Sequence, residues 1–218
     1  MTLVIASAVS DGVLLGGDTL ISIEDGKVAT LSKIPGGKVF AIGNRFGVVT
    51  YGTYAGQTPV PQTMATLTVD RGESTASFAS RLLGIFEQPR AGNTLRAIIA
   101  GVDGDIFRII EAPGPHEQAV QKLRTGVEVG FWSGSLWGED PTKLPSWPAG
   151  RSPRELAGEM TVNTAREFFG SLMRAAAAAQ PRRVGPEMDA VIVAKEGVER
   201  IACAQPCTCR SLEVGSHQ

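Results

Sequence analysis

Short apolar segments joined by tight-turn signals run through this chain and restrict its fold more than any other feature. Turn signals such as Ser10-Asp11-Gly12, Glu24-Asp25-Gly26-Lys27 and Val102-Asp103-Gly104 each separate two apolar runs, and Glu196-Gly197 does the same near the end. An Asp-Gly or similar pair between apolar runs is a strong hairpin signal. Strands joined by hairpins are antiparallel, so the sequence predicts antiparallel sheets.

Two helices are predicted among these strands. Ser74 precedes an apolar stripe with helical spacing, formed by Phe78, Leu82, Ile85 and Phe86. Ser152-Pro153-Arg154-Glu155 is a capping box with proline at the first helical position. We expect one long helix from there to 175–179, ending before Pro181. Strands and helices in this order predict an α+β fold, with one domain over 1–202 and a tail over 203–218.

Composition and charge exclude several classes of function. The chain has 218 residues, 43% of them apolar, and a net charge of −1. This balance gives no broad basic face for nucleic acid, and no apolar run approaches the ~18 residues of a membrane span. The start lacks the positive segment of a signal peptide, so we expect a strand there and a cytoplasmic protein. The alternative, an exported binding protein, would require cleavage after Ala8.

Cysteines occur only near the end of the chain. Cys203, Cys207 and Cys209 are odd in number, which does not fit a disulfide framework. With His217 they could form a Cys₃His zinc site, but their spacing fits no standard zinc motif. We favour a reduced tail and expect no metal and no cofactor.

Hairpin geometry brings three reactive residues together. If the second hairpin turns on Asp25-Gly26, paired residue numbers sum to 51, and Asp18 lies opposite Lys33. The first hairpin, turning at 10–12, places Thr2 opposite a residue at 19–21. Thr2, Asp18 and Lys33 are therefore predicted to converge, provided that neither ladder contains a bulge.

These three residue types form a coherent catalytic set. Removal of Met1 would give Thr2 a free amine with a pKa of about 7.7–8.0, which can act as a base near neutral pH. Such an amine can activate the threonine hydroxyl as a nucleophile. A charged Lys33, oriented by Asp18, would lower the proton affinity of both groups. The alternative interpretation is a solvated Asp–Lys surface pair beside an ordinary threonine.

Several segments resemble the proteasome β subunits and the related bacterial heat-shock peptidase, which are N-terminal nucleophile hydrolases. The N-terminal segments are Thr2-Leu-Val-Ile-Ala, Asp11-Gly-Val-Leu-Leu-Gly-Gly-Asp18-Thr19 and Ser32-Lys33-Ile34. The later ones are Leu95-Arg-Ala-Ile-Ile-Ala-Gly101 and Val184-Gly-Pro-Glu-Met-Asp189-Ala-Val-Ile-Val. The Asp-to-Lys spacing is about one residue shorter than in the family.

The resemblance implies a four-layer αββα sandwich, in which two antiparallel sheets lie face to face with helices outside. It also implies a threonine-type endopeptidase that acts on peptides or unfolded proteins without a cofactor. Thr2, Asp18 and Lys33 would be its catalytic residues. Family members form rings, so we expect a homo-oligomer, with any partner ATPase unidentified.

Departures from the family pattern leave alternatives open. The Asp and Ser that assist the family's nucleophile have no match in Pro181-Arg-Arg-Val-Gly185. Ser133 could play a supporting role, and either Gly47 or Gly56 could donate to the oxyanion. The two competing interpretations are a catalytically inactive scaffold subunit and a hydrolase of small amides on the same scaffold.

Overall fold

The structure is a computed structural model, and it describes most of the chain. The described residues are 3–25, 28–33, 37–52, 60–86, 95–112, 122–125, 129–133 and 141–201. For residues 21–33, 122–133 and 141 within these ranges, the description covers the backbone only. The predicted cysteine tail, 203–218, lies outside the described residues.

The first five-stranded sheet holds both the beginning and the end of the described chain. Its spatial order is β10-β1-β2-β11-β12, and all neighbouring strands are antiparallel. The strands are β1 (Leu3–Val9), β2 (Gly12–Asp18), β10 (Val129–Ser133), β11 (Met188–Ala194) and β12 (Gly197–Ile201). The hairpins predicted at residues 10–12 and at 196–197 are both present, and paired numbers in β1–β2 sum to 21.

The second five-stranded sheet is a meander of consecutive strands in the order β5-β6-β7-β8-β9. Its strands are β5 (Val39–Ile42), β6 (Phe46–Tyr51), β7 (Arg96–Asp103), β8 (Ile106–Ala112) and β9 (Lys122–Thr125). Each pairs antiparallel with the next. The two sheets pack face to face over an apolar cluster that includes Val4, Leu15, Val49, Ile98 and Val191.

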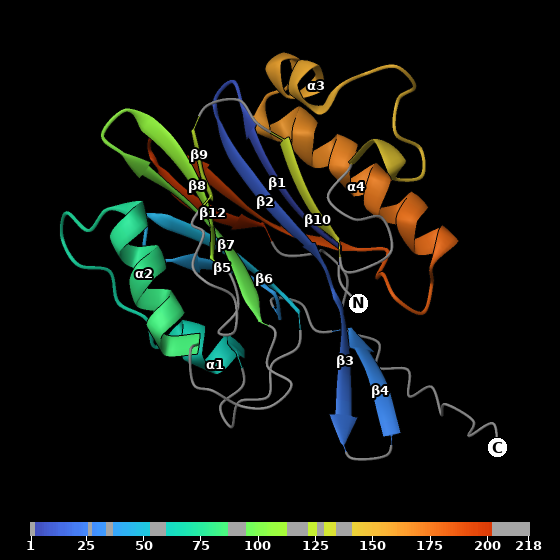
Figure 1. Cartoon of the computed structure of the whole chain (residues 1–218), viewed down its shortest axis with the longest axis horizontal. Coiled ribbons are helices and arrows are strands. Elements are labelled where there is room, and N and C mark those ends of the chain that lie inside the picture. The colour runs from blue at the N-terminus through green and yellow to red at the C-terminus, as the bar shows by residue number, and fades with distance from the viewer. Residues whose placement is uncertain are drawn as a thin grey trace.

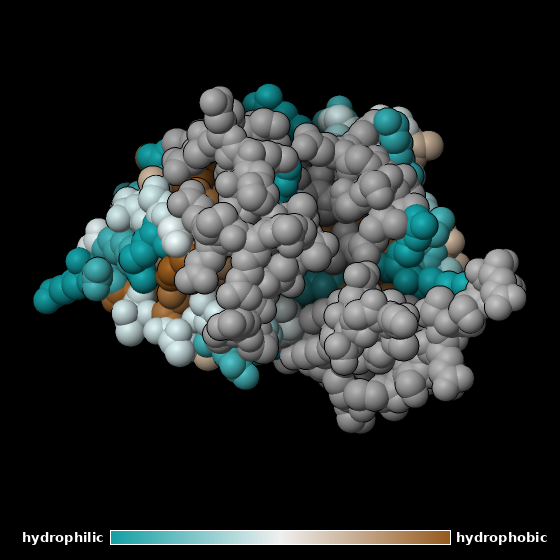
Figure 2. Space-filling view, turned by 60° about the horizontal axis from the view of Figure 1, so that its bottom comes forward, coloured by the Kyte–Doolittle hydropathy of each residue, from teal (hydrophilic) through white to brown (hydrophobic). Residues whose placement is uncertain are grey.

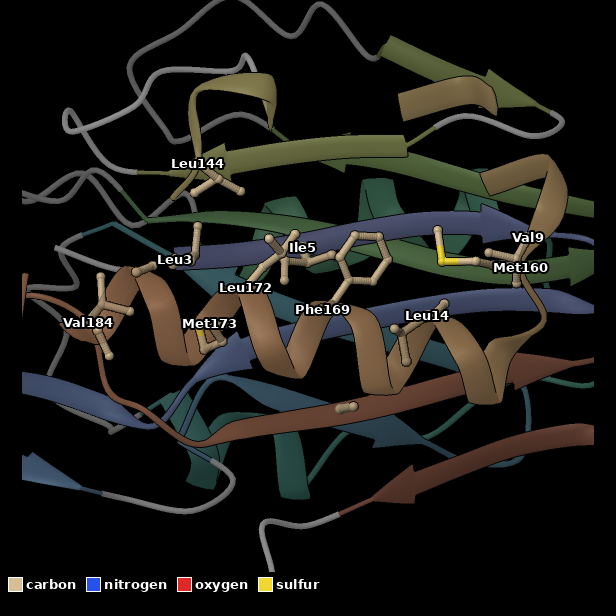
Figure 3. Close-up of a cluster of buried hydrophobic side chains, with 14 of the residues drawn as sticks. Leu3, Ile5, Val9, Leu14, Leu144, Met160, Phe169, Leu172, Met173 and Val184 are labelled. Carbon is tan, nitrogen blue, oxygen red and sulfur yellow. The ribbon is translucent and has the colours of Figure 1, made fainter. Parts of the chain in front are cut away.

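Helices cover the outer face of each sheet (Figure 1). The second sheet is covered by α1 (Val60–Ala65) and α2 (Thr75–Phe86), and the first by α3 (Pro153–Glu159) and α4 (Val162–Ala179). Alternate residues of β1 point outward, so that Leu3 and Ile5 pack beneath Phe169 and Leu172 of α4 (Figure 3). The four-layer αββα sandwich predicted from the sequence is confirmed.

The helix predicted from Ser152 onward is two helices rather than one. The capping box of Ser152 and Glu155 is formed as expected. However, α3 ends at Glu159, and its C-cap, Met160, has an extended backbone. Thr161 then caps α4 with a second capping box through Thr164. A residue in the extended conformation cannot continue a helix, so the chain restarts at a new cap.

A separate hairpin extends from one end of the sandwich. Strands β3 (Leu20–Asp25) and β4 (Val28–Lys33) pair only with each other. Figure 1 shows this hairpin leaving the body where β1 begins and β2 ends. Figure 2 turns that end forward, and the described residues on it are mainly hydrophilic or neutral, with apolar colour in small areas. We call the end that carries the β3–β4 hairpin the N-terminal end of the sandwich. The turns at 43–45, 104–105 and 195–196 form the opposite end.

Candidate active site

A buried carboxylate at the N-terminal end of the sandwich binds four donors. Asp18 ends β2 and is almost fully buried. Its Oδ1 accepts hydrogen bonds from the Leu3 backbone N–H and from Lys38 Nζ, both at 2.9 Å. Its Oδ2 accepts from the backbone N–H groups of Leu20 and Gly185, both at 3.1 Å. A carboxylate can be buried when its lone pairs are satisfied in this way.

Lys38 supplies the positive charge of this site. Its Nζ lies 2.9 Å from Asp18 Oδ1 and 2.5 Å from the carbonyl oxygen of Leu20. Burial lowers the pKa of the Lys38 ammonium below its usual value of 10.5, while the nearby charges of Asp18 and Asp189 oppose that change. Lys38 is thus a buried amine whose proton affinity is lowered by burial. Its Nζ contacts two acceptors, the Asp18 carboxylate and the Leu20 carbonyl oxygen.

The predicted pairing of Asp18 with Lys33 is wrong. In the β3–β4 ladder Lys33 lies opposite Leu20 and Asp25 opposite Val28, so paired numbers sum to 53 rather than 51. Asp18 belongs to β2, and one residue separates β2 from β3, so it takes no part in that ladder. The lysine that contacts Asp18 is instead Lys38, directly before β5 and five positions further along the chain.

The predicted nucleophile, Thr2, lies outside the described residues. It is bonded to Leu3, whose N–H donates to Asp18 as described above. On the other side of β1, Ser133 is the residue directly opposite Leu3 in the β1–β10 ladder. Asp18, Lys38 and the backbone of Ser133 are therefore gathered around the residue that follows Thr2.

Of the two glycines considered as oxyanion donors, Gly47 is a packing position. A Cβ placed on it would lie 2.7 Å from Val191 Cγ1 and 2.9 Å from Val193 Cγ2 of the facing sheet. Gly56 lies outside the described residues. Gly52 was not among the predicted oxyanion donors. It is exposed, follows β6 at the N-terminal end, and has a φ of 97°, which favours glycine.

The segment after α4 also reaches the site, although the sequence showed no catalytic residue there. The backbone N–H of Gly185 is one of the four donors to Asp18. Thr19 Oγ1 donates to Glu187 Oε2 at 3.2 Å, which ties the same segment to the end of β2. A Cβ on Gly185 would lie 3.1 Å from the Leu20 nitrogen, so glycine allows this close approach.

Lys38 carries a weak sequence signal. It follows Gly36-Gly37 and directly precedes the apolar run that forms β5. A lysine directly before a buried strand is a candidate for a buried charge, but only the correct register of the β3–β4 hairpin would have excluded Lys33 as the partner of Asp18.

Comparisons with known proteins show the fold and nothing narrower. No known protein family matches the sequence, and no curated protein matches it. Among the solved structures that share the fold are Anbu from Hyphomicrobium sp. strain MC1 and its Gly-1 mutant. The mutant is 13% identical with a TM-score of 0.59, covering 94% of this chain and 88% of its own. The other is 12% identical with a TM-score of 0.58, covering 93% and 88%.

These findings correct the predicted family assignment. At 13% identity a structural likeness establishes the N-terminal nucleophile hydrolase fold, which is proteasome-like, and not membership of the proteasome β-subunit and heat-shock peptidase family. The chain therefore has an Anbu-like fold. Within the described part of the chain, no helix is long and apolar enough to cross a membrane.

Proposed function

We propose that this protein hydrolyses amide bonds as a threonine-type peptidase, with Thr2 as its nucleophile once Met1 has been removed. The observation that carries the proposal is the Asp18 carboxylate, whose Oδ1 accepts from both the N–H of Leu3 and the Lys38 ammonium. Burying such a pair is costly. A buried, mutually bonded carboxylate and amine beside a would-be N-terminal threonine favours a catalytic site over a surface ion pair.

The reaction would be an acyl transfer in two halves. Thr2 Oγ attacks the carbonyl carbon of the substrate while the Thr2 amine, directly or through a water, accepts the hydroxyl proton. Breaking of the C–N bond transfers that proton to the leaving amine and leaves an ester on Thr2. Water then attacks the ester under the same base, which releases the acid and restores the hydroxyl.

Lys38 replaces Lys33 in this proposal as the charge that supports the nucleophile. Its ammonium would lower the proton affinity of the Thr2 hydroxyl and amine by electrostatic repulsion. Asp18 would orient the ammonium and, through the Leu3 N–H, fix the start of β1. The N–H of Gly52 is the candidate donor to the oxyanion, because Gly52 lies two residues after Thr50, whose own N–H donates to the Lys38 carbonyl oxygen at 2.8 Å.

Thr2→Ala is the direct test. Hydrolysis of fluorogenic peptides should fall to background, while the circular dichroism spectrum and Tm stay near those of the wild type. Intact mass must show that Met1 is absent from both proteins, and a threonine-directed covalent inhibitor should add its mass to the wild type alone. Full activity in Thr2→Ala, or a chain that keeps Met1 in its own host and still hydrolyses peptides, would rule out this nucleophile.

Lys38→Met and Lys33→Met form a matched pair that tests the reassigned lysine. If Lys38 supports the nucleophile, its variant should lose at least about a hundredfold in kcat, the range typical of removing one electrostatic group from an active site. Lys33→Met should lose much less. A larger loss in Lys33→Met than in Lys38→Met would return the role to Lys33.

Assembly remains part of the proposal. A homo-oligomeric ring would enclose the site and restrict it to peptides and unfolded chains. Light scattering coupled to size exclusion would measure the mass in solution, and a monomer with full activity on peptides would separate the chemistry from the assembly.

A further inference from the structure

A second polar cluster, built around the buried Glu111, lies on the inner face of the second sheet. Tyr51 Oη donates to Glu111 Oε1 at 2.6 Å, and Arg96 Nη1 lies 3.6 Å from the same oxygen. Three strands contribute: Tyr51 ends β6, Arg96 begins β7 and lies directly opposite Tyr51, and Glu111 is on β8. We call these three residues the inner-face cluster.

This cluster lies at the same end of the sandwich as the Asp18–Lys38 pair. Tyr51 follows Thr50, whose N–H binds the Lys38 carbonyl oxygen. Tyr51 also packs against the apolar cluster between the two sheets, and Arg96 shares a strand face with Ile98 of that cluster. The inner-face cluster is therefore connected to the candidate site through a chain of direct neighbours, on the face that looks toward β1.

Within the cluster, the positive group is the one that solvent reaches. The side chain of Arg96 is 30% exposed, against 9% for Glu111. Burial and the hydrogen bond to Glu111 raise the pKa of the Tyr51 hydroxyl, so it stays neutral. The ion pair with Glu111 restrains the Arg96 guanidinium, which reduces the entropy that Arg96 would lose on binding a ligand.

We propose that Arg96, held by Glu111 and Tyr51, binds a carboxylate of the substrate and makes this enzyme selective for acidic peptides. The inference rests on the proposed function, since it assigns the substrate class of that same site. A planar guanidinium matches a carboxylate with two parallel hydrogen bonds. The carboxylate can belong to a Glu or Asp side chain beside the scissile bond or to the C-terminus of a short peptide.

Matched peptides distinguish these two sources of the carboxylate. One series carries Glu, Gln or Lys next to the scissile bond with an amidated C-terminus. The other carries Gln there with a free or an amidated C-terminus. The wild type should show a kcat/KM about tenfold to a hundredfold higher for the carboxylate member of one pair, as expected for a hydrogen bond to a charged group.

Arg96→Gln should abolish that preference by lowering kcat/KM for the carboxylate peptide to the level of its neutral match. Arg96→Lys should restore part of it, because the charge returns without the planar fork. Arg108→Gln is the control: Arg108 forms a similar ion pair with Asp103, at 3.5 Å and with 26% of its side chain exposed, near the opposite end of the same sheet. This variant should keep the wild-type preference.

Calorimetric binding to the Thr2→Ala protein separates this inference from the proposed function. There the carboxylate peptide should bind about tenfold or more tightly than its neutral match, and adding Arg96→Gln should remove the difference. Thr2-dependent hydrolysis with no charge preference would overturn the acidic selectivity and leave the function standing. Absence of hydrolysis, with carboxylate binding that still depends on Arg96, would overturn the function and leave the site. Equal binding of both peptides to the folded protein would overturn the site itself.

Discussion

The two ends of the sandwich each hold a lysine–aspartate pair, and the two pairs differ in burial rather than in distance. At the N-terminal end Lys38 Nζ lies 2.9 Å from Asp18, with 9% and 0% of the side chains exposed. At the opposite end Lys195 Nζ lies 3.0 Å from Asp105, with 54% and 92% exposed. Almost the same ion-pair distance therefore occurs in two environments whose energetics are very different.

The burial and hydrogen bonds around the Asp18–Lys38 pair, rather than the ion pair itself, therefore mark the candidate site. An exposed pair is screened by water and contributes about 0–1 kcal/mol. A buried pair must overcome a desolvation cost of several kcal/mol for each ion, which further hydrogen bonds can offset. Asp18 has three backbone N–H donors besides Lys38, whereas Asp105 is open to solvent.

The largest effect is expected from removing one carboxylate at each end. Asp18→Ala would leave Lys38 buried without its partner and would free three N–H donors, so the free energy of unfolding should fall by about 3–5 kcal/mol. Asp105→Ala should lower it by less than about 1 kcal/mol. Urea unfolding of both variants at pH 7.5 measures the difference.

Adding Lys38→Met to Asp18→Ala sharpens this test. Replacing both charges by apolar groups removes the unpaired ammonium, so the double variant should regain part of the lost stability. Equal losses in Asp18→Ala and Asp105→Ala would mean that Asp18 is far more hydrated than its burial indicates, and the contrast between the two ends would disappear.

Local sequence signals predicted an antiparallel α+β fold, and the family resemblance implied its four-layer arrangement. Asp18 follows from a short turn and an apolar strand whose length fixes where it ends, and the β1–β2 register fell in the predicted range. Lys38 does not follow from such signals, because its contact with Asp18 is a tertiary one. The predicted β3–β4 register, with paired numbers that sum to 51 instead of 53, placed Lys33 opposite Asp18 where the structure has Lys38.

The groups from later parts of the chain that complete these clusters could not be predicted from the sequence either. Gly185 binds Asp18 across 167 positions of sequence, through a backbone group that any residue type carries. Arg96, Tyr51 and Glu111 meet only because the meander stacks their three strands in register. Backbone donors and cross-strand clusters have no motif, so they appear only once the strand order is known.

An intermediate effect is expected at the inner-face cluster. Tyr51→Phe removes the hydroxyl bonded to the Glu111 carboxylate, a hydrogen bond to a charged and buried group, and should cost about 1–3 kcal/mol of unfolding free energy. Arg108→Gln near the other end of the sheet should cost less than about 1 kcal/mol. Asp103 keeps its hydrogen bonds from the Thr75 N–H and hydroxyl, each 2.9 Å long. A loss in Arg108→Gln as large as in Tyr51→Phe would show that both ends depend equally on their charges.

The smallest effect concerns the pH dependence of stability that burial gives to Lys38. Because burial lowers the folded-state pKa of Lys38, the native state releases this proton before the unfolded state does as pH rises. Between that lowered pKa and 10.5 the unfolded chain binds more protons, so stability contributed by this group increases with pH. Asp18 and Asp189 oppose the lowering, which keeps the effect below that of deleting a carboxylate. Urea unfolding between pH 8 and pH 10.5 should therefore show the wild type gaining stability relative to Lys38→Met. A wild type that loses stability relative to Lys38→Met as pH rises would mean that the ion pair with Asp18 outweighs burial and raises this pKa.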